Sequence, residues 1–170
     1  VDAVNSMAID SSGNIYVTGV RGDDYSIVTI KYAANGTQSW LSRNTQGYPN
    51  YNPHICVDKA NNVYVTVESH SSPNQPDILT FKYDSTGQQK WFINYTGIGS
   101  PSYDRPSHIA LDSADNIFVC GGSGNIYSSG GDYVTIKYNT SGKLIWIKGY
   151  NGPGNSWDEA SAIAVDGSGN

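Results

Sequence analysis

Six stretches rich in Gly, Pro, Ser and Asn carry many of the aromatic and charged side chains of this sequence. An aromatic ring can stack on a sugar or on a protein side chain, while a neighbouring carboxylate, guanidinium or amide supplies hydrogen bonds. We therefore predict that these stretches bind a ligand. The predicted ligand-binding residues are Tyr48, Tyr51, Tyr103, Asp104, Arg105, Tyr127, Trp157 and Asp158. The alternative is that the aromatic rings cover the edges of neighbouring structural units, because such rings usually stabilise proteins by burial.

Metal binding finds little support in the spacing of the possible ligands. His54 and His108 hold equivalent positions of a repeat described below, but Ser6 and Ala162 hold that position elsewhere. A zinc site needs three or more protein ligands. Asp also recurs at one position, as Asp10, Asp58, Asp112 and Asp166. Calcium needs six or more oxygens, and a turn Asp usually binds its own backbone, so we predict no metal.

Catalytic signatures are equally weak. The sequence contains no nucleophile elbow and no phosphate-binding loop, and the adjacent carboxylates Asp158 and Glu159 would point apart on a strand. The tripeptide Arg-Gly-Asp at 21–23 resembles an integrin-binding motif, but a three-residue match is frequent by chance. We predict no enzymatic activity and no cofactor.

The elements that carry these stretches are repeated. The Asn that ends a tight turn falls at Asn14, Asn62, Asn116 and Asn170, at intervals of 48, 54 and 54 residues. The segment "DYVTIKYNTSGKLIW" at 132–146 nearly copies "DILTFKYDSTGQQKW" at 77–91, and "SIVTIKYAANGTQSW" at 26–40 is a third version. A single catalytic site does not require such copies, whereas a structural unit that is stacked several times does.

Each repeat predicts four antiparallel strands, A to D, because four runs rich in Val, Ile, Thr, Tyr and Phe are bounded by Gly, Asn, Asp or Ser. A period of about 50 residues fits the four-stranded blade of a β-propeller. In such a blade the A–B and C–D loops lie on one face, and the B–C and D–A loops lie on the other. The B–C and D–A loops vary most and carry the predicted ligand-binding residues, as expected of loops on a rigid scaffold.

The repeats resemble the SBBP-type β-propeller repeat, through "DSSGNIYVTG" at 10–19 and the Asp-to-Trp segments quoted above. The resemblance extends over essentially the whole chain, with single departures at Ser26, Val67 and Cys120. It implies a secreted or surface-located bacterial protein. The blade is also similar to quinoprotein-type blades, which implies that Trp40, Trp91 and Trp146 pack between blades.

The number of repeats is unusual for a propeller. We expect one all-β unit over 1–170, with blades at about 1–46, 50–98 and 104–152 and the inner strand of a fourth blade at 158–166. Closed propellers have four to eight blades, so we expect an arc of a longer chain or closure with another copy. Lys31, Lys82 and Lys137 recur in strand C as structural residues. Each must find a partner between sheets, and we expect the strand-A Asp to be that partner.

The composition excludes two classes of partner. The net charge is −5 without a basic run, which argues against nucleic acid, and no apolar stretch is long enough for membrane insertion. Cys56 and Cys120 hold different repeat positions, so we expect two buried thiols rather than a disulfide. We predict a non-enzymatic extracellular structural or binding module for a protein or carbohydrate. The alternatives are a self-assembling subunit of a surface fibre or multi-chain ring, with copies of itself as partners, and a scaffold fragment of a larger secreted enzyme.

Overall fold

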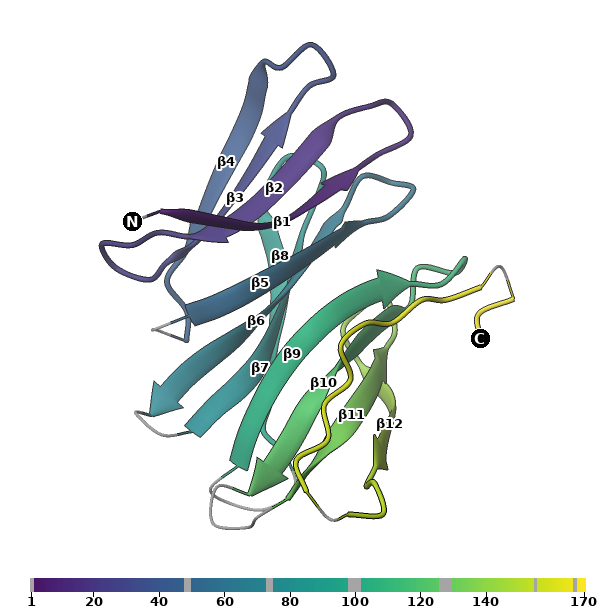
Figure 1. Cartoon of the computed structure of the whole chain (residues 1–170). Coiled ribbons are helices and arrows are strands. Elements are labelled where there is room, and N and C mark those ends of the chain that lie inside the picture. Colours follow the sequence, from purple (N-terminus) through teal and green to yellow (C-terminus); the bar gives the residue numbers. More distant parts are fainter. Residues whose placement is uncertain are drawn as a thin grey trace.

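A computed structural model describes residues 2–47, 50–72, 75–97, 102–125, 130–154, 156–166 and 168–170, which contain twelve strands and no helix. The strands form three four-stranded antiparallel sheets, and within each sheet they follow chain order (Figure 1). The first sheet contains β1 (Ala3–Ile9), β2 (Ile15–Val20), β3 (Ile27–Tyr32) and β4 (Gln38–Asn44). The second contains β5 (Asn50–Val57), β6 (Val63–Ser72), β7 (Gln75–Tyr83) and β8 (Gln89–Tyr95). The third contains β9 (Ser102–Leu111), β10 (Ile117–Asn125), β11 (Gly131–Tyr138) and β12 (Leu144–Tyr150).

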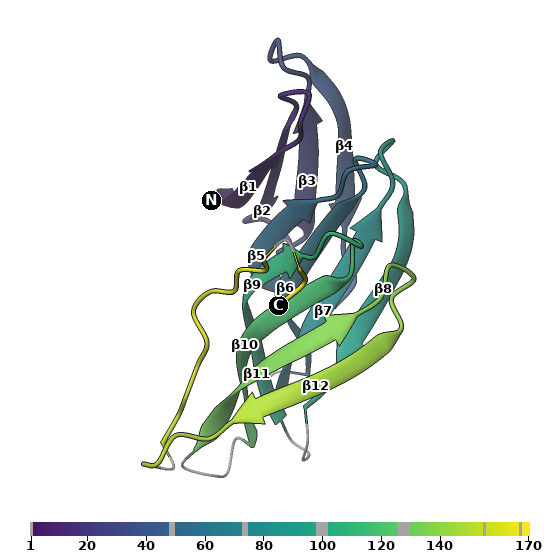
Figure 2. The same cartoon turned by 90° about the vertical axis from the view of Figure 1, so that its right-hand side faces the viewer.

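The three sheets stack as successive blades. The inner strand β5 lies against β1 and β2 of the preceding sheet, and β9 lies against β5, β6 and β7. The outer strands β4, β8 and β12 lie on the opposite side of the stack from these inner strands (Figure 2). The prediction of an all-β propeller segment with three four-stranded blades is confirmed.

Tight turns set the register of each blade. The A–B turns place Gly13, Asn61 and Asp115 at one position with φ of 78°, 64° and 60°. Gly, Asn and Asp are the residues that adopt a positive φ at least cost, which is why this position accepts only these types here. The C–D turns place Gly36, Gly87 and Gly142 at φ between 84° and 86°.

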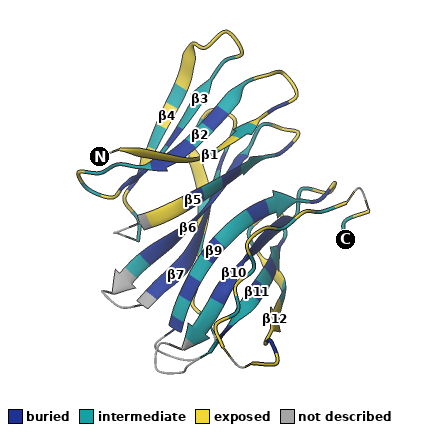
Figure 3. Cartoon of the chain, viewed as in Figure 1, coloured by how far each residue is buried: buried dark blue, intermediate teal, exposed yellow. Residues whose placement is uncertain are grey.

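The core consists of two layers, one on each side of the second blade. Val63, Val65 and Val67 of β6 are buried against blade one, while Tyr64 points to the other side and is buried against blade three. This alternation follows from the two-residue period of a strand. Blade two is therefore covered on both faces, and much of it is buried (Figure 3), whereas β1 and β4 are largely exposed.

Residues 158–166, expected to be the inner strand of a fourth blade, are described but form no strand. An inner strand needs a neighbouring strand B for its hydrogen-bond ladder, and strand B of this repeat is not among the 170 residues. The segment instead runs along blade three, where the Asp158 and Ala160 amides donate to the carbonyls of Gly131 and Gly121, at 2.7 and 3.4 Å. The turn at Asp166 repeats the A–B turn of the three blades, since the Asn170 amide donates to the Asp166 carboxylate.

Candidate functional site

The predicted ligand-binding residues belong to the face of the B–C and D–A loops, but Tyr48 and Tyr127 lie outside the described residues. Tyr51 packs edge-on against Tyr25 and His70, with ring centroids 5.7 and 5.2 Å apart. The contact with Tyr25 joins the B–C loop of blade one to β5 of blade two. Tyr51 as a whole residue is 37% exposed.

Asp104 and Asp158 hold the D–A loops in place. They lie at equivalent positions of consecutive repeats, and each carboxylate accepts a hydrogen bond of 2.6 Å from a loop amide, that of Gly97 or Gly152. Asp104 is fully buried, and burial raises the pKa of its carboxyl despite hydrogen bonds from Ser123 and Gly97. Both carboxylates therefore have a structural role in shaping the loop face.

Trp157 covers a patch of glycines on blade three. A Cβ added to Gly131 would lie 2.4 Å from the indole, and one added to Gly124 would lie 3.0 Å away. Tyr103 meets the same ring edge-on at 5.7 Å. Trp157 as a whole residue is nevertheless 40% exposed. The glycines in "GGSGN" at 121–125 leave room for the indole because they lack a Cβ. The sequence shows these glycines, but only the structure shows that Trp157 packs on them.

Arg105 is part of a chain of hydrogen-bonded side chains. Its Nε donates to Glu68 Oε2 at 3.0 Å, and the other oxygen of Glu68 lies 2.9 Å from His70 Nε2. The Glu68 side chain is only 5% exposed. Burial alone would lower the pKa of Arg105, but the hydrogen bond and charge of Glu68 raise it. The guanidinium also lies over the Tyr103 ring, 5.4 Å from its centroid.

These groups surround an open concavity of about 530 Å³ near the inner strands. Its lining residues are Asn52, His54, Glu68, Arg105, Pro106, Ser107, Glu159 and Ser161. Ser107 Oγ donates to Glu159 Oε1 at 2.9 Å, which ties the 158–166 segment to β9. Sequence reasoning named Arg105 but missed Glu68, because its role depends on the pairing of two blades.

His54 and His108 lie side by side at the equivalent position of β5 and β9, with ring centroids 6.0 Å apart. Burial and the neighbouring His108 lower the pKa of His54, so its imidazole is neutral at pH 7. No group of three or more His, Cys, Asp or Glu side chains suited to a metal ion occurs in the described part of the chain. Cys56 and Cys120 are free thiols, and burial raises the pKa of Cys120 to about 11.

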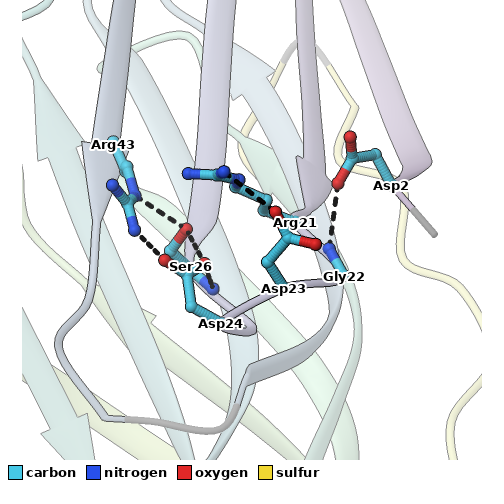
Figure 4. Close-up of polar contacts among 7 residues, drawn as sticks. All are labelled: Asp2, Arg21, Gly22, Asp23, Asp24, Ser26 and Arg43. Atoms are coloured by element: carbon cyan, nitrogen blue, oxygen red, sulfur yellow. Dashed lines mark hydrogen bonds and ion pairs between the residues drawn. The ribbon is translucent and has the colours of Figure 1, made fainter.

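The Arg-Gly-Asp stretch is engaged within its own loop (Figure 4). Arg21 pairs with Asp23 at 2.9 Å, and the Gly22 amide donates to Asp2 at 3.0 Å. Next to it, Asp24 forms an ion pair with Arg43 and accepts a hydrogen bond from Ser26 at 2.7 Å. The carboxylate and the guanidinium of the motif thus bind each other.

The recurrent Asp of strand A organises the opposite face. The Asp10 carboxylate accepts hydrogen bonds from the Ser12 and Asn14 amides, from the Asn14 side chain and from the Tyr16 hydroxyl. Asp58 repeats the pattern, with Tyr64 as the hydroxyl donor at 3.0 Å. Burial alone would raise the pKa of Asp10, but these hydrogen bonds hold it below its usual value.

The lysines of strand C differ between blades because of this hydroxyl. Blade three has Phe118 at the position of the two tyrosines, and Lys137 Nζ lies 3.2 Å from the Asp112 carboxylate in its place. The Lys–Asp pair expected from the sequence is thus present in blade three. In the other blades the tyrosine hydroxyl binds the Asp oxygen. The ammonium groups of Lys31 and Lys82 lie 5.1 and 5.0 Å from the tyrosine ring centroids, and Lys137 lies 4.6 Å from that of Phe118.

The strand-D tryptophans of blades one and two lie against the following blade. Trp40 lies against Gly87 of blade two, and its Nε1 donates to the Ser85 carbonyl at 3.0 Å. Trp91 lies against Gly142 of blade three in the same way. Trp146 belongs to the last complete blade and packs edge-on on Phe118 of its own sheet, with centroids 5.9 Å apart.

Comparison with known proteins agrees with this architecture at the start of the chain. The family model "SBBP: Beta-propeller repeat" matches residues 2–20, which form β1, the A–B turn and β2. No curated protein matches the chain. A crystal structure of a protein of unknown function from Bacteroides caccae is similar with 16% identity and a TM-score of 0.49, over 86% of this chain and 46% of that protein. This chain thus spans less than half of that protein's length.

No helix that could cross a membrane is found among the described residues. The family match agrees with the resemblance seen in the sequence over residues 2–20, the first two strands of blade one.

Proposed function

We propose that this chain is a non-enzymatic binding module of a bacterial secreted or surface protein, and that it binds a carbohydrate at the concavity of the loop face. The concavity carries the proposal. Its volume of about 530 Å³ lies within the about 300–1,000 Å³ typical of small-ligand sites, which favours a sugar over a flat protein surface.

The chemistry of the lining supports this ligand class. Glu159, Ser107 and Asn52 offer acceptors and donors for hydroxyl groups, and Arg105 adds a cation whose position is held by Glu68. Trp157 does not line the concavity, but its Nε1 donates to Glu159 Oε2 at 3.4 Å, so an aromatic residue lies next to a lining carboxylate. An aromatic face beside polar groups is suited to a sugar ring, which has both an apolar face and hydroxyls.

A glycan array followed by isothermal titration calorimetry tests the proposal. We expect a sugar ligand with a dissociation constant in the range of about 1 μM to 1 mM. Glu159→Ala should weaken it at least about tenfold, the effect of losing about 1.4 kcal/mol of polar contacts. Gln88→Ala, an exposed change on the opposite face, should leave the affinity unchanged. If no glycan binds at millimolar concentration to the folded protein, the carbohydrate proposal is wrong and a protein ligand becomes the next candidate.

A further inference from the structure

A second cavity lies between blades two and three and shares no lining residue with the concavity of the proposed sugar site. Its volume is about 220 Å³, and Tyr95 of blade two lines it from one side. Blade three supplies Ser123, Asp132, Val134, Ile147 and Gly149. The lining thus contains one carboxylate and no Lys, Arg or His side chain. Tyr95 and Ile147 also pack on the core between the two blades, so the cavity belongs to a contact between two complete blades.

The carboxylate in this cavity has a hydrogen-bonded counterpart in blade two. Asp132 and Gly149 of blade three correspond to Asp77 and Asn94, because the Asp-to-Trp segments align and each pair lies on the neighbouring strands C and D. Asn94 Nδ2 donates to Asp77 Oδ2 at 3.0 Å. A strand-D side chain thus binds the strand-C carboxylate in blade two.

In blade one the same strand-D position holds a guanidinium group. Arg43 corresponds to Gly149, and its Nε donates at 3.0 Å to the Oγ of Ser26, the counterpart of Asp132 (Figure 4). Arg43 also forms an ion pair with Asp24. This position of the blade can therefore hold a guanidinium group beside strand C.

Blade three keeps the carboxylate but lacks the strand-D side chain. A Cβ placed on Gly149 would meet only the Tyr133 carbonyl oxygen, at 3.7 Å. Within the part of the chain that the structure describes, the Asp132 carboxylate has no hydrogen bond or ion pair. The cavity beside Gly149 is thus the space that a strand-D side chain fills in the other blades, and Asp132 is the group that such a side chain would bind.

The size and the lining of the cavity favour one planar cation as its occupant. Its volume is below the range of about 300–1,000 Å³ typical of sites for whole small molecules, so it is suited to a single side chain. A guanidinium group can donate two parallel hydrogen bonds to one carboxylate, and it can stack on an aromatic ring such as that of Tyr95. Burial raises the pKa of Tyr95, so its phenol is neutral at pH 7 and Asp132 alone sets the charge of the lining.

We propose that this cavity binds the guanidinium group of an arginine side chain from a partner protein, with the Asp132 carboxylate as its acceptor. Arg43 shows that this chemistry fits the position. An amino sugar offers an ammonium group instead, on a ring that is larger than one side chain. The cavity is separate from the proposed sugar site, so the arginine and the sugar bind independently.

NMR titration of the ¹⁵N-labelled chain with the tripeptide acetyl-Gly-Arg-Gly-amide tests the proposal. We expect the backbone amide signals of Asp132 and Gly149 to shift, with a dissociation constant of about 1 mM. The same peptide with citrulline in place of arginine has nearly the same shape without the charge. It should bind at least about tenfold more weakly.

Two variants test whether the peptide binds at this cavity. Asp132→Asn removes the charge with little change in shape, and Gly149→Arg supplies a guanidinium group from the chain itself, so each should weaken peptide binding at least about tenfold. Gly149 does not have a positive φ, so a side chain at this position should allow folding, which far-UV circular dichroism checks. The matched control Asp23→Asn removes the same charge from an exposed loop of blade one, and Glu159→Ala alters the proposed sugar site. Both should leave peptide binding unchanged.

Four results would overturn the proposal. The first is the absence of shifts at Asp132 and Gly149 with peptide up to about 20 mM. The second is equal binding of the arginine and citrulline peptides. The third is peptide binding that the folded Asp132→Asn and Gly149→Arg variants retain in full. The fourth is a shift of the same amides by glucosamine at lower concentration than by the peptide, which would make an amino sugar the ligand.

Discussion

Replacing Trp91 with Ala should destabilise the chain far more than the same change at Trp146. A fully buried Trp side chain removes about 150–250 Å² from water, at about 25 cal/mol per Å². Trp91 is half-buried, with its ring 6.1 Å from Tyr64 and against Gly142. Its side chain therefore removes about half of that area from water, and the variant loses this burial. Together with the gap left between the blades, the expected loss in the free energy of unfolding is about 3 kcal/mol.

The matched variant Trp146→Ala removes the same side chain where the chain offers no following blade. Its loss should be smaller, about 1 kcal/mol, because Trp146 packs on Phe118 of its own sheet and not on a following blade. Urea denaturation followed by far-UV circular dichroism measures both. Equal losses for the two variants would refute the reasoning, because they would show that contact with the next blade contributes nothing.

Three further outcomes follow from the turns and from the Asp–Lys pair. Lys137→Met should cost about 1–2 kcal/mol of stability in urea denaturation, because Asp112 loses the ammonium donor. Adding Phe118→Tyr should recover about 1 kcal/mol, because the new hydroxyl replaces the ammonium as donor to Asp112. No recovery would contradict this exchange of donors. Burial alone would raise the pKa of Asp112, but hydrogen bonds from Asn116 and Lys137 hold it below its usual value, so its stabilisation is present above about pH 4 and is lost as pH falls through the folded-state pKa. Stabilities of the wild type and Asp112→Asn, measured from pH 7 to pH 2, should therefore converge toward the acid end, and a constant difference would argue against this. Gly87→Ala should cost about 2 kcal/mol more than Gly36→Ala, since both glycines have a positive φ but only Gly87 lies under an indole; equal midpoints in the same denaturation assay would disprove that contact.

The repeated features of the fold could be predicted from the sequence because each depends on neighbouring residues. The run rich in β-branched and aromatic residues at 63–67 and the turn from Asp10 to Asn14 are local patterns, and both recur in every blade. The inner strand expected at 158–166 is not formed, because a strand depends on a hydrogen-bonded partner strand and not on neighbouring residues alone. Its sequence has the pattern of a strand, but a ladder needs two strands.

The candidate site was harder to predict because its residues meet only after blades are stacked. Glu68 and Arg105 are 37 residues apart and belong to different sheets. No local pattern links them. The lysine partners were mispredicted in blades one and two for a related reason, because the Tyr16 and Tyr64 hydroxyls compete with the ammonium groups for the same Asp oxygen.

The burial of blade two on both faces implies a gradient of local unfolding along the stack. The amides of β6 and β7 should exchange with solvent only when the whole array opens, whereas β4 and β12 can fray with little loss of contact. Opening would therefore start at the terminal blades and move inward. A protease would accordingly cut first in the terminal blades and leave a protected fragment that contains β5 to β8.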